Sequence, residues 1–299
     1  MKKKITIILL TAVMALSGCS SIPKQERVVR VTTVRKQAAV LLERGHAEYR
    51  WDGYDSSLNQ YRNAFLLASS VDWQEGIVRS LVHISRSLDR LGRTEEALAH
   101  VSAASELLEA DSPAELRVLV LNRTAEWYFL QGNRKDAGTA VQQALTAGEG
   151  ITSQETGETW RIKAALHKRA GEYDQALAAV ESAAALDEKG GFIAELASDY
   201  YIRASVLSLT GDSEGAAASM MQALEKDKFI ENTPGIAQDL YGLGRIYEKA
   251  GDSDNAVLYF KRAYLVYKGS GKGTVPEKIT ESLETLTGSP WWITETEKL

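Results

Sequence analysis

Few side chains in this sequence have the types and spacing that catalysis or metal binding requires. The only cysteine, Cys19, offers a thiol that could carry a covalent group, but it has no second cysteine for a disulfide or redox pair. The histidines, His46, His83, His100 and His167, are scattered, and none has a second histidine at the spacing of a metal motif. Carboxylates are plentiful but fall on the polar faces of expected helices. We therefore predict no catalytic residue, no metal ligand and no cofactor, and expect a protein that is not an enzyme.

Residues 269–274 have the look of a phosphate-binding loop, because glycines surround Lys272. The match fails at two places. The first required glycine falls at Val266, and Lys272 is followed by Gly273 where the motif needs serine or threonine. A helical pattern also precedes the segment, not a strand. We interpret it as a flexible linker.

The strongest pattern in the chain is a repeat of small residues with a period of about 40. In each copy a glycine is followed five positions later by alanine, nine later by an apolar residue and twelve later by a second alanine. The last three positions share one face of a helix, so each copy indicates a turn followed by a closely packed helix. The copies are Gly92/Ala97/Val101/Ala104, Gly132/Ala137/Val141/Ala144, Gly171/Ala176/Val180/Ala183, Gly211/Ala216/Met220/Ala223 and Gly251/Ala256/Phe260/Ala263.

A small residue also recurs upstream of each glycine, as in Ser85 and Gly244, and a degenerate first copy has Gly45 in that place with Asp52 at the turn. This pattern resembles the tetratricopeptide repeat. The resemblance implies an all-α, right-handed superhelical solenoid of about six helix pairs over residues 30–268. The period exceeds that family's usual value of about 34, and HEAT-type helix pairs also run near 40 residues. The glycine and alanine offsets favour the tetratricopeptide type.

The repeats stop near Lys268, so we assign residues 269–299 to a linker, a capping helix and a tail. A helix from Thr274 to about Leu286 should cover the last repeat, as terminal caps do in repeat arrays. Trp291 and Trp292 follow it on a polar tail, either folded back on the solenoid or buried in a partner.

The N-terminus carries a second strong pattern. Three lysines precede an apolar run, Ile5 to Leu16, that is too short to span a bilayer and is typical of a secretion signal. The run ends in Leu16-Ser17-Gly18-Cys19, which resembles a bacterial lipobox. The resemblance implies a signal peptide over residues 1–18, a lipid on Cys19 and a lipidated linker over residues 19–29. Ser20 implies sorting to the outer membrane. The alternative is a plain signal peptide with a stray thiol.

The charge balance argues against nucleic acid as a partner. The formal net charge is −5, and removing the three signal lysines leaves 32 basic against 40 acidic side chains. An acidic mature chain lacks the basic surface that binds phosphate backbones.

The family resemblance places the partner-binding surface on the first helix of each pair, where four positions line a concave groove. These positions bring basic groups toward the middle of the groove, although Asp89, Glu126 and Glu158 share it and could leave them as ordinary solvated side chains. The predicted groove residues are Arg79, Arg86, Arg90, Asn122, Phe129, Arg161, Lys168, Tyr201, Tyr241 and Arg245.

Together these features predict a scaffold or adaptor held by its lipid on the periplasmic face of an outer membrane. Its partners should be envelope proteins or peptide segments bound in the groove. Repeat lipoproteins of similar build serve in pilus and outer-membrane assembly, which is an analogy of class alone. The alternative is a cell-wall enzyme whose active site carries no recognisable motif.

Overall fold

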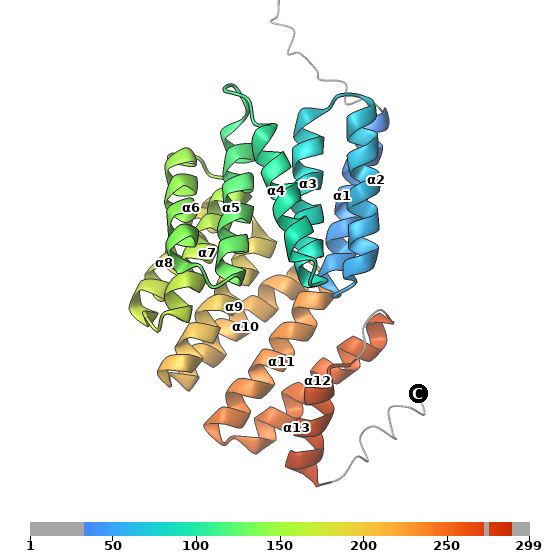
Figure 1. Ribbon diagram of the computed structural model, residues 1–299. Helices are drawn as coiled ribbons and strands as arrows, with labels where there is room; N and C mark the ends of the chain where they lie inside the picture. Colours follow the sequence, from blue (N-terminus) through green and yellow to red (C-terminus); the bar gives the residue numbers. More distant parts are fainter. Residues whose placement is uncertain (1–32, 272–274, 289–299) are drawn as a thin grey trace, which may run out of the picture. The chain divides into compact units, whose positions relative to one another are not determined.

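The computed structural model describes residues 33–271 and 275–288 (Figure 1). These residues form thirteen α-helices and, within the described ranges, no β-strand, which confirms the predicted all-α solenoid. The signal peptide, Cys19, the 19–29 linker, Trp291 and Trp292 lie outside the described residues. The helices are α1 (Thr33–Arg50), α2 (Tyr54–Ser70), α3 (Gln74–Arg90), α4 (Thr94–Glu106), α5 (Ala114–Leu130), α6 (Arg134–Ala147), α7 (Gln154–Arg169), α8 (Tyr173–Gly190), α9 (Ile193–Thr210), α10 (Ser213–Phe229), α11 (Thr233–Ala250), α12 (Ser253–Ser270) and α13 (Glu277–Thr287).

The first twelve helices pack as six consecutive pairs. We call the first helix of each pair the A helix (α1, α3, α5, α7, α9 and α11) and the second the B helix (α2, α4, α6, α8, α10 and α12). Each helix contacts the next along the chain, and the A helices of neighbouring pairs contact one another from α1 through α9. In the described part of the chain, none of the helices combines the length and the apolar character needed to cross a membrane.

The turn within each pair depends on a left-handed residue. Gly92, Gly132, Gly171, Gly211 and Gly251 have φ between 74° and 90°, a conformation that costs glycine little. In the first pair Asp52 takes this role with φ 59°. The predicted positions of all six turns are therefore confirmed.

Small side chains allow the two helices of a pair to approach closely. All ten alanines of the five sequence copies are fully buried. In the sixth pair, a Cβ placed on Gly244 of α11 would lie 2.5 Å from the Phe260 ring of α12. In the first pair a Cβ on Gly45 would lie 2.3 Å from the Tyr61 ring. The two end pairs thus combine glycine with an aromatic ring, where the four middle pairs combine serine or alanine with valine or methionine.

The predicted capping helix is present as α13. It packs on α12 and buries Ile279 and Leu283 completely within the apolar core that α10, α11 and α12 share. It begins at Glu277 after Pro276, since Pro276 and not Thr274 stands at the N-cap position. The apolar face of the last B helix is thereby covered.

Two other helices begin differently from what their residue types suggest. Ser112 has the residue type of an N-cap for α5, but Pro113 occupies the N-cap position and the Ser112 hydroxyl instead accepts the Glu109 backbone N–H at 2.8 Å. The serine stabilises the loop before the helix because the backbone doubles back there. At α11 the N-cap is Asn232, one residue before Thr233, and Pro234 lies in the first turn, where proline is tolerated.

The turn of the first pair reaches far along the solenoid. Trp51, between α1 and α2, packs edge-to-face on Tyr267 of α12 with ring centroids 6.1 Å apart. The same turn borders a cavity with residues of α9 and α11. The first helix pair therefore contacts the sixth as well as its neighbour in sequence.

Candidate partner-binding groove

A series of cavities follows the A helices, and we call it the inner groove. The largest has a volume of about 850 Å³ and is lined by α1, α3, α5, α7 and the start of α9. A second of about 300 Å³ lies between α3 and α5, and a third of about 320 Å³ lies between the α1–α2 turn and α9 to α11. Tyr49 of α1 lines all three. The predicted residues Arg79, Arg86, Asn122 and Arg161 line the largest cavity.

Ion pairs between neighbouring A helices hold the middle of the inner groove together. Arg86 of α3 donates two hydrogen bonds to Glu126 of α5, at 2.8 and 2.9 Å, and lies 3.5 Å from Glu158 of α7. Glu158 also accepts a hydrogen bond from Arg161 at 3.0 Å. Burial alone would raise the pKa of Glu158, but the charges of Arg161 and Arg86 outweigh it and lower the pKa to about 2. Glu158 is therefore charged at neutral pH and paired with both arginines.

Arg161 extends this network into the interior. Its guanidinium contacts Asp187 of α8 and lies 3.2 Å from Asp199 of α9, and both carboxylates are completely buried. Burial raises the pKa of Asp199 to about 8 despite the attraction of Arg161. Arg161 is itself only 7 % exposed. Its main contact is thus with the solenoid.

Three further polar side chains join the A helices. Arg123 of α5 is buried and pairs with Asp89 of α3, and it donates a hydrogen bond to Ser85 at 2.8 Å. Arg79 pairs with Glu155 at 2.9 Å. Asn122, fully buried, donates to the Glu155 backbone carbonyl at 2.7 Å and accepts from Thr159 at 2.7 Å. A buried amide with both ends satisfied positions α7 against α5.

The remaining predicted residues are more accessible. Arg90 donates to the Tyr49 hydroxyl at 3.1 Å, and the half-buried Phe129 lies under the Arg169 guanidinium at 5.0 Å. Burial lowers the pKa of Lys168, whose ammonium donates to Ser205 at 2.8 Å. Tyr201 is 37 % exposed.

The last two predicted residues, Tyr241 and Arg245, lie on α11. Arg245 donates to the Tyr241 hydroxyl at 3.2 Å and lies 3.3 Å from Glu248, with about half of its side chain exposed. These two residues sit at the accessible end of the A-helix layer.

These contacts decide between the two interpretations of the basic groups. The arginines in the middle of the groove are paired with Glu126 and Glu158, and Arg161 also contacts Asp187 and Asp199, so these basic groups are engaged within the solenoid. Arg161 and Asn122 have structural roles because they are buried and fully engaged. Binding of a partner by the other eight residues stays a prediction.

The structure brings together two histidines that the sequence keeps apart. His46 of α1 and His83 of α3 lie with their Nε2 atoms 3.2 Å apart, and the Tyr61 ring stacks on His83. Burial, with Arg86 and Arg50 nearby, lowers the pKa of His46 to about 4. No group of three or more His, Cys, Asp or Glu side chains in the described ranges is placed to hold a metal ion. His167 contacts Glu172 at 2.7 Å in the α7–α8 turn.

Several groove residues escaped the sequence reasoning. Tyr49 and Arg50 belong to the degenerate first repeat, whose register was only partly assigned. The buried aspartates of α8 to α11 had a usable signal, because Asp187 and Asp199 recur as Asp227 and Asp239 with the repeat's own 40-residue period.

Comparison with known proteins agrees with this architecture. Residues 240–272 match the family model of the tetratricopeptide repeat. A search among curated proteins finds no match to the sequence.

Solved structures share the fold at low sequence identity. BtubC from P. vanneervenii aligns with a TM-score of 0.58 at 16 % identity, over 81 % of this chain and 94 % of that one. A Rap protein in complex with Competence and Sporulation Factor aligns with a TM-score of 0.55 at 17 % identity, over 85 % and 70 %. PilW, described as a widely conserved type IV pilus biogenesis factor, aligns with a TM-score of 0.52 at 14 % identity, over 84 % and 98 %. With its matched repeat at 240–272 and six helix pairs in series, this chain has the fold of a tetratricopeptide-repeat protein.

Proposed function

We propose that this protein is a lipid-anchored adaptor on the periplasmic face of an outer membrane. It holds a segment of an envelope protein in its inner groove during assembly of an outer-membrane or pilus complex. The observation that carries the proposal is the inner groove itself, a cavity of about 850 Å³ lined by five A helices and braced by ion pairs between repeats. A preformed groove of this kind binds an extended or helical segment with little reorganisation.

Two observations outside the groove support the proposal. The lone Cys19 at the end of a short apolar signal supports lipid attachment, which would confine the complex to a membrane surface. The shared fold of PilW supports pilus assembly as the pathway, at the level of fold alone.

The lipid is tested directly at Cys19. In the native host, the wild-type protein should fractionate with the outer membrane, and its mature N-terminus should carry acyl mass. Cys19→Ala should leave the protein unprocessed or in the soluble fraction, because the thiol is the only attachment point of its kind in the chain. An unmodified N-terminus on the wild type would contradict this part of the proposal.

The groove is tested by aromatic truncation. Tyr201→Ala combined with Tyr241→Ala should weaken capture of the partner roughly 10-fold or more, because accessible aromatic side chains act as binding anchors. Tyr201 is 37 % exposed and Tyr241 is half-buried. Leu66→Ala combined with Leu258→Ala is the matched control, since these side chains are 63 % and 49 % exposed on B helices. Capture should be quantified by mass spectrometry after crosslinking the full lipidated chain in membranes. Equal losses in both pairs would place the partner elsewhere.

Charge is tested separately at the accessible cations. Lys168→Glu combined with Arg245→Glu should weaken capture at low salt more than at high salt, because exposed charges are screened over about 8–10 Å. Arg86 and Arg161 are unsuitable for this test, since their reversal would disrupt the solenoid's own ion pairs. A muropeptide-release assay on the same preparations distinguishes the enzyme alternative. A stoichiometric partner without released muropeptides supports the adaptor.

A further inference from the structure

An acid pair occurs twice in the solenoid. Asp187 of α8 and Asp199 of α9 form the first pair, and Asp227 of α10 and Asp239 of α11 stand at the same places one repeat later. All four are buried, with 0, 0, 5 and 2 % of their surface exposed. Buried carboxylates need a partner, because removing a charge from water is costly.

The Asp187–Asp199 acid pair contacts a cation within the protein, and the Asp227–Asp239 acid pair does not. Arg161 of α7 contacts both carboxylates of the first pair. The residue 40 positions after Arg161 is Tyr201, which is neutral and cannot take that role. In the part of the chain that the structure describes, the Asp239 Oδ2 atom has no hydrogen-bond partner; Asp187 and Asp199 each also have one such oxygen, but Arg161 contacts their other oxygens. Asp227 accepts one hydrogen bond, from the Asn232 amide at 2.9 Å.

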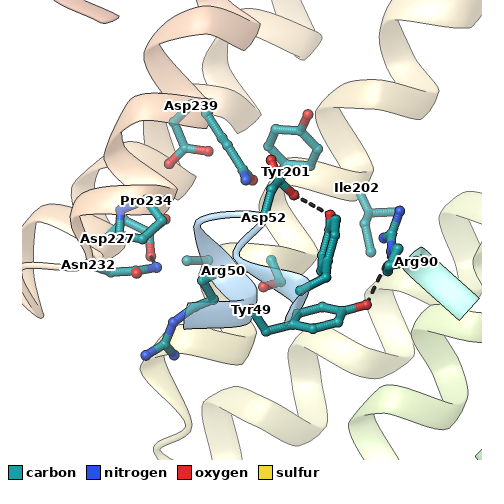
Figure 2. A pocket seen from close by; sticks show the side chains of 15 residues that line it. Tyr49, Arg50, Asp52, Arg90, Tyr201, Ile202, Asp227, Asn232, Pro234 and Asp239 are labelled. Atoms are coloured by element: carbon teal, nitrogen blue, oxygen red, sulfur yellow. Dashed lines mark hydrogen bonds between the residues drawn. The ribbon is translucent and has the colours of Figure 1, made fainter. Parts of the chain in front are cut away.

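A cavity of about 320 Å³ opens beside the second pair. Figure 2 shows Asp227 and Asp239 on one side of it, Tyr201 of α9 on another, and the α1–α2 turn reaching in between. At Asp187 and Asp199 the corresponding region is occupied by the Arg161 side chain. The second pair therefore combines a buried, unpartnered carboxylate oxygen with open space.

Other charged groups border this cavity. Arg50 of α1 is close enough to lower the pKa of Asp227, but it is exposed and forms no ion pair with either aspartate. Asp52 accepts the Tyr54 hydroxyl, and Arg90 of α3 is engaged with Tyr49. The cavity thus retains an acidic side at Asp227 and Asp239, with which no basic side chain of the described residues that line it forms an ion pair.

We propose that this cavity receives an arginine side chain of the bound partner, with its guanidinium held between Asp227 and Asp239 as Arg161 is held between Asp187 and Asp199. This inference rests on the proposed function, since it names the chemistry of the segment that the groove binds. A guanidinium fits because its forked donors can reach two carboxylates at once.

The protonation of Asp227 and Asp239 supports the assignment of this cavity to an arginine side chain. Burial and the neighbouring Asp227 raise the pKa of Asp239 to about 8. At neutral pH the pair therefore holds a proton in place of a cation. A guanidinium must displace that proton, so its affinity should rise between pH 6 and pH 8, on the order of tenfold or more.

The test uses the full chain in detergent and a small probe, Nα-acetyl-arginine amide, followed by calorimetry or by NMR shifts. The neutral isostere Nα-acetyl-citrulline amide should bind at least about tenfold more weakly, because it lacks the charge. Nα-acetyl-lysine amide should fall between them, since an ammonium reaches one carboxylate at a time. Equal binding of arginine and citrulline probes would overturn the proposal.

Two variants locate the site. Asp239→Asn keeps the side-chain shape and should weaken the arginine probe about tenfold, whereas Asp199→Asn, at the pair already filled by Arg161, should leave its affinity unchanged. Tyr201→Arg restores the missing cation and should abolish probe binding while raising the melting temperature. Retained binding in either Asp239→Asn or Tyr201→Arg would overturn the assignment.

The probe experiment is independent of any envelope partner or lipid. If the arginine probe binds at Asp239 but no envelope protein is captured, the proposed function fails and the site stands. If a partner is captured through Tyr201 and Tyr241 while the probe ignores Asp239, the inference fails and the adaptor stands.

Discussion

Replacing Arg161 by methionine should lower the free energy of unfolding by about 3–5 kcal/mol. Methionine keeps part of the volume but removes the charge, which leaves Asp187 and Asp199 buried beside each other without a cation. Breaking a buried ion network by removing one partner costs more than the pair itself contributes, because the remaining charges stay desolvated. Urea unfolding followed by circular dichroism at pH 9 measures the loss.

Two controls separate charge from packing. Adding Asp187→Asn and Asp199→Asn to Arg161→Met should recover most of the loss, since no uncompensated charge remains. The loss in the single variant should also be smaller at pH 5 than at pH 9. In the wild type burial raises the pKa of Asp199 to about 8 although Arg161 lowers it, so without Arg161 this pKa lies higher still. At pH 5 Asp199 is protonated in both folded proteins, whereas at pH 9 the wild type carries the charge that Arg161 stabilises. A loss that is the same at both pH values would show that the arginine contributes by packing alone.

Gly244→Leu should destabilise the C-terminal end of the solenoid by about 3 kcal/mol, the upper part of the range for overpacked cores. Even a Cβ at Gly244 would lie 2.5 Å from the Phe260 ring, and a leucine adds three further carbons. Hydrogen exchange should increase most in α9 to α13, because Phe260 belongs to the apolar core that these five helices form together. Uniform exchange along the chain would contradict local loosening.

The matched rescue copies another repeat. Gly244→Ala alone should destabilise the protein, and Gly244→Ala combined with Phe260→Val should recover stability, because Ala125 and Val141 occupy the same two places in the third pair. A coupling energy of about 0.5–3 kcal/mol between the two substitutions is expected for side chains in direct contact. Additive effects would show that the glycine is not needed for this contact.

The fold was largely predictable because each repeat has small residues at fixed positions in its turn and in its helix contact. Glycine at a left-handed turn and alanine at a helix contact are required by backbone geometry and by close packing, and both requirements act within one repeat. Helix starts were less predictable. Ser112 has the residue type of an N-cap, but the path of the preceding loop assigns its hydroxyl to Glu109 instead.

The repeat register predicted that Arg86 and Arg161 lie on the inner face, and both line the inner groove, but partner binding there stays a prediction. Their ion-pair partners were not predictable, because several come from helices one or two repeats away. A sequence shows how many charges a face carries, while the pairing of those charges depends on distances between A helices. The first repeat adds Tyr49 and Arg50 to the groove through a contact across the solenoid that no repeat pattern encodes.

A solenoid whose helix pairs contact only their sequence neighbours is flexible as a whole, because small bends at each junction between repeats accumulate. The contact between Trp51 and Tyr267 connects the turn of the first pair with the last B helix. Extending or untwisting the solenoid then requires these rings to separate, which makes the solenoid stiffer than its repeat-to-repeat junctions alone. A stiffer solenoid loses less conformational entropy when a segment binds. A contact between the first and last helix pairs thereby restricts how far the helices that line the inner groove can move apart.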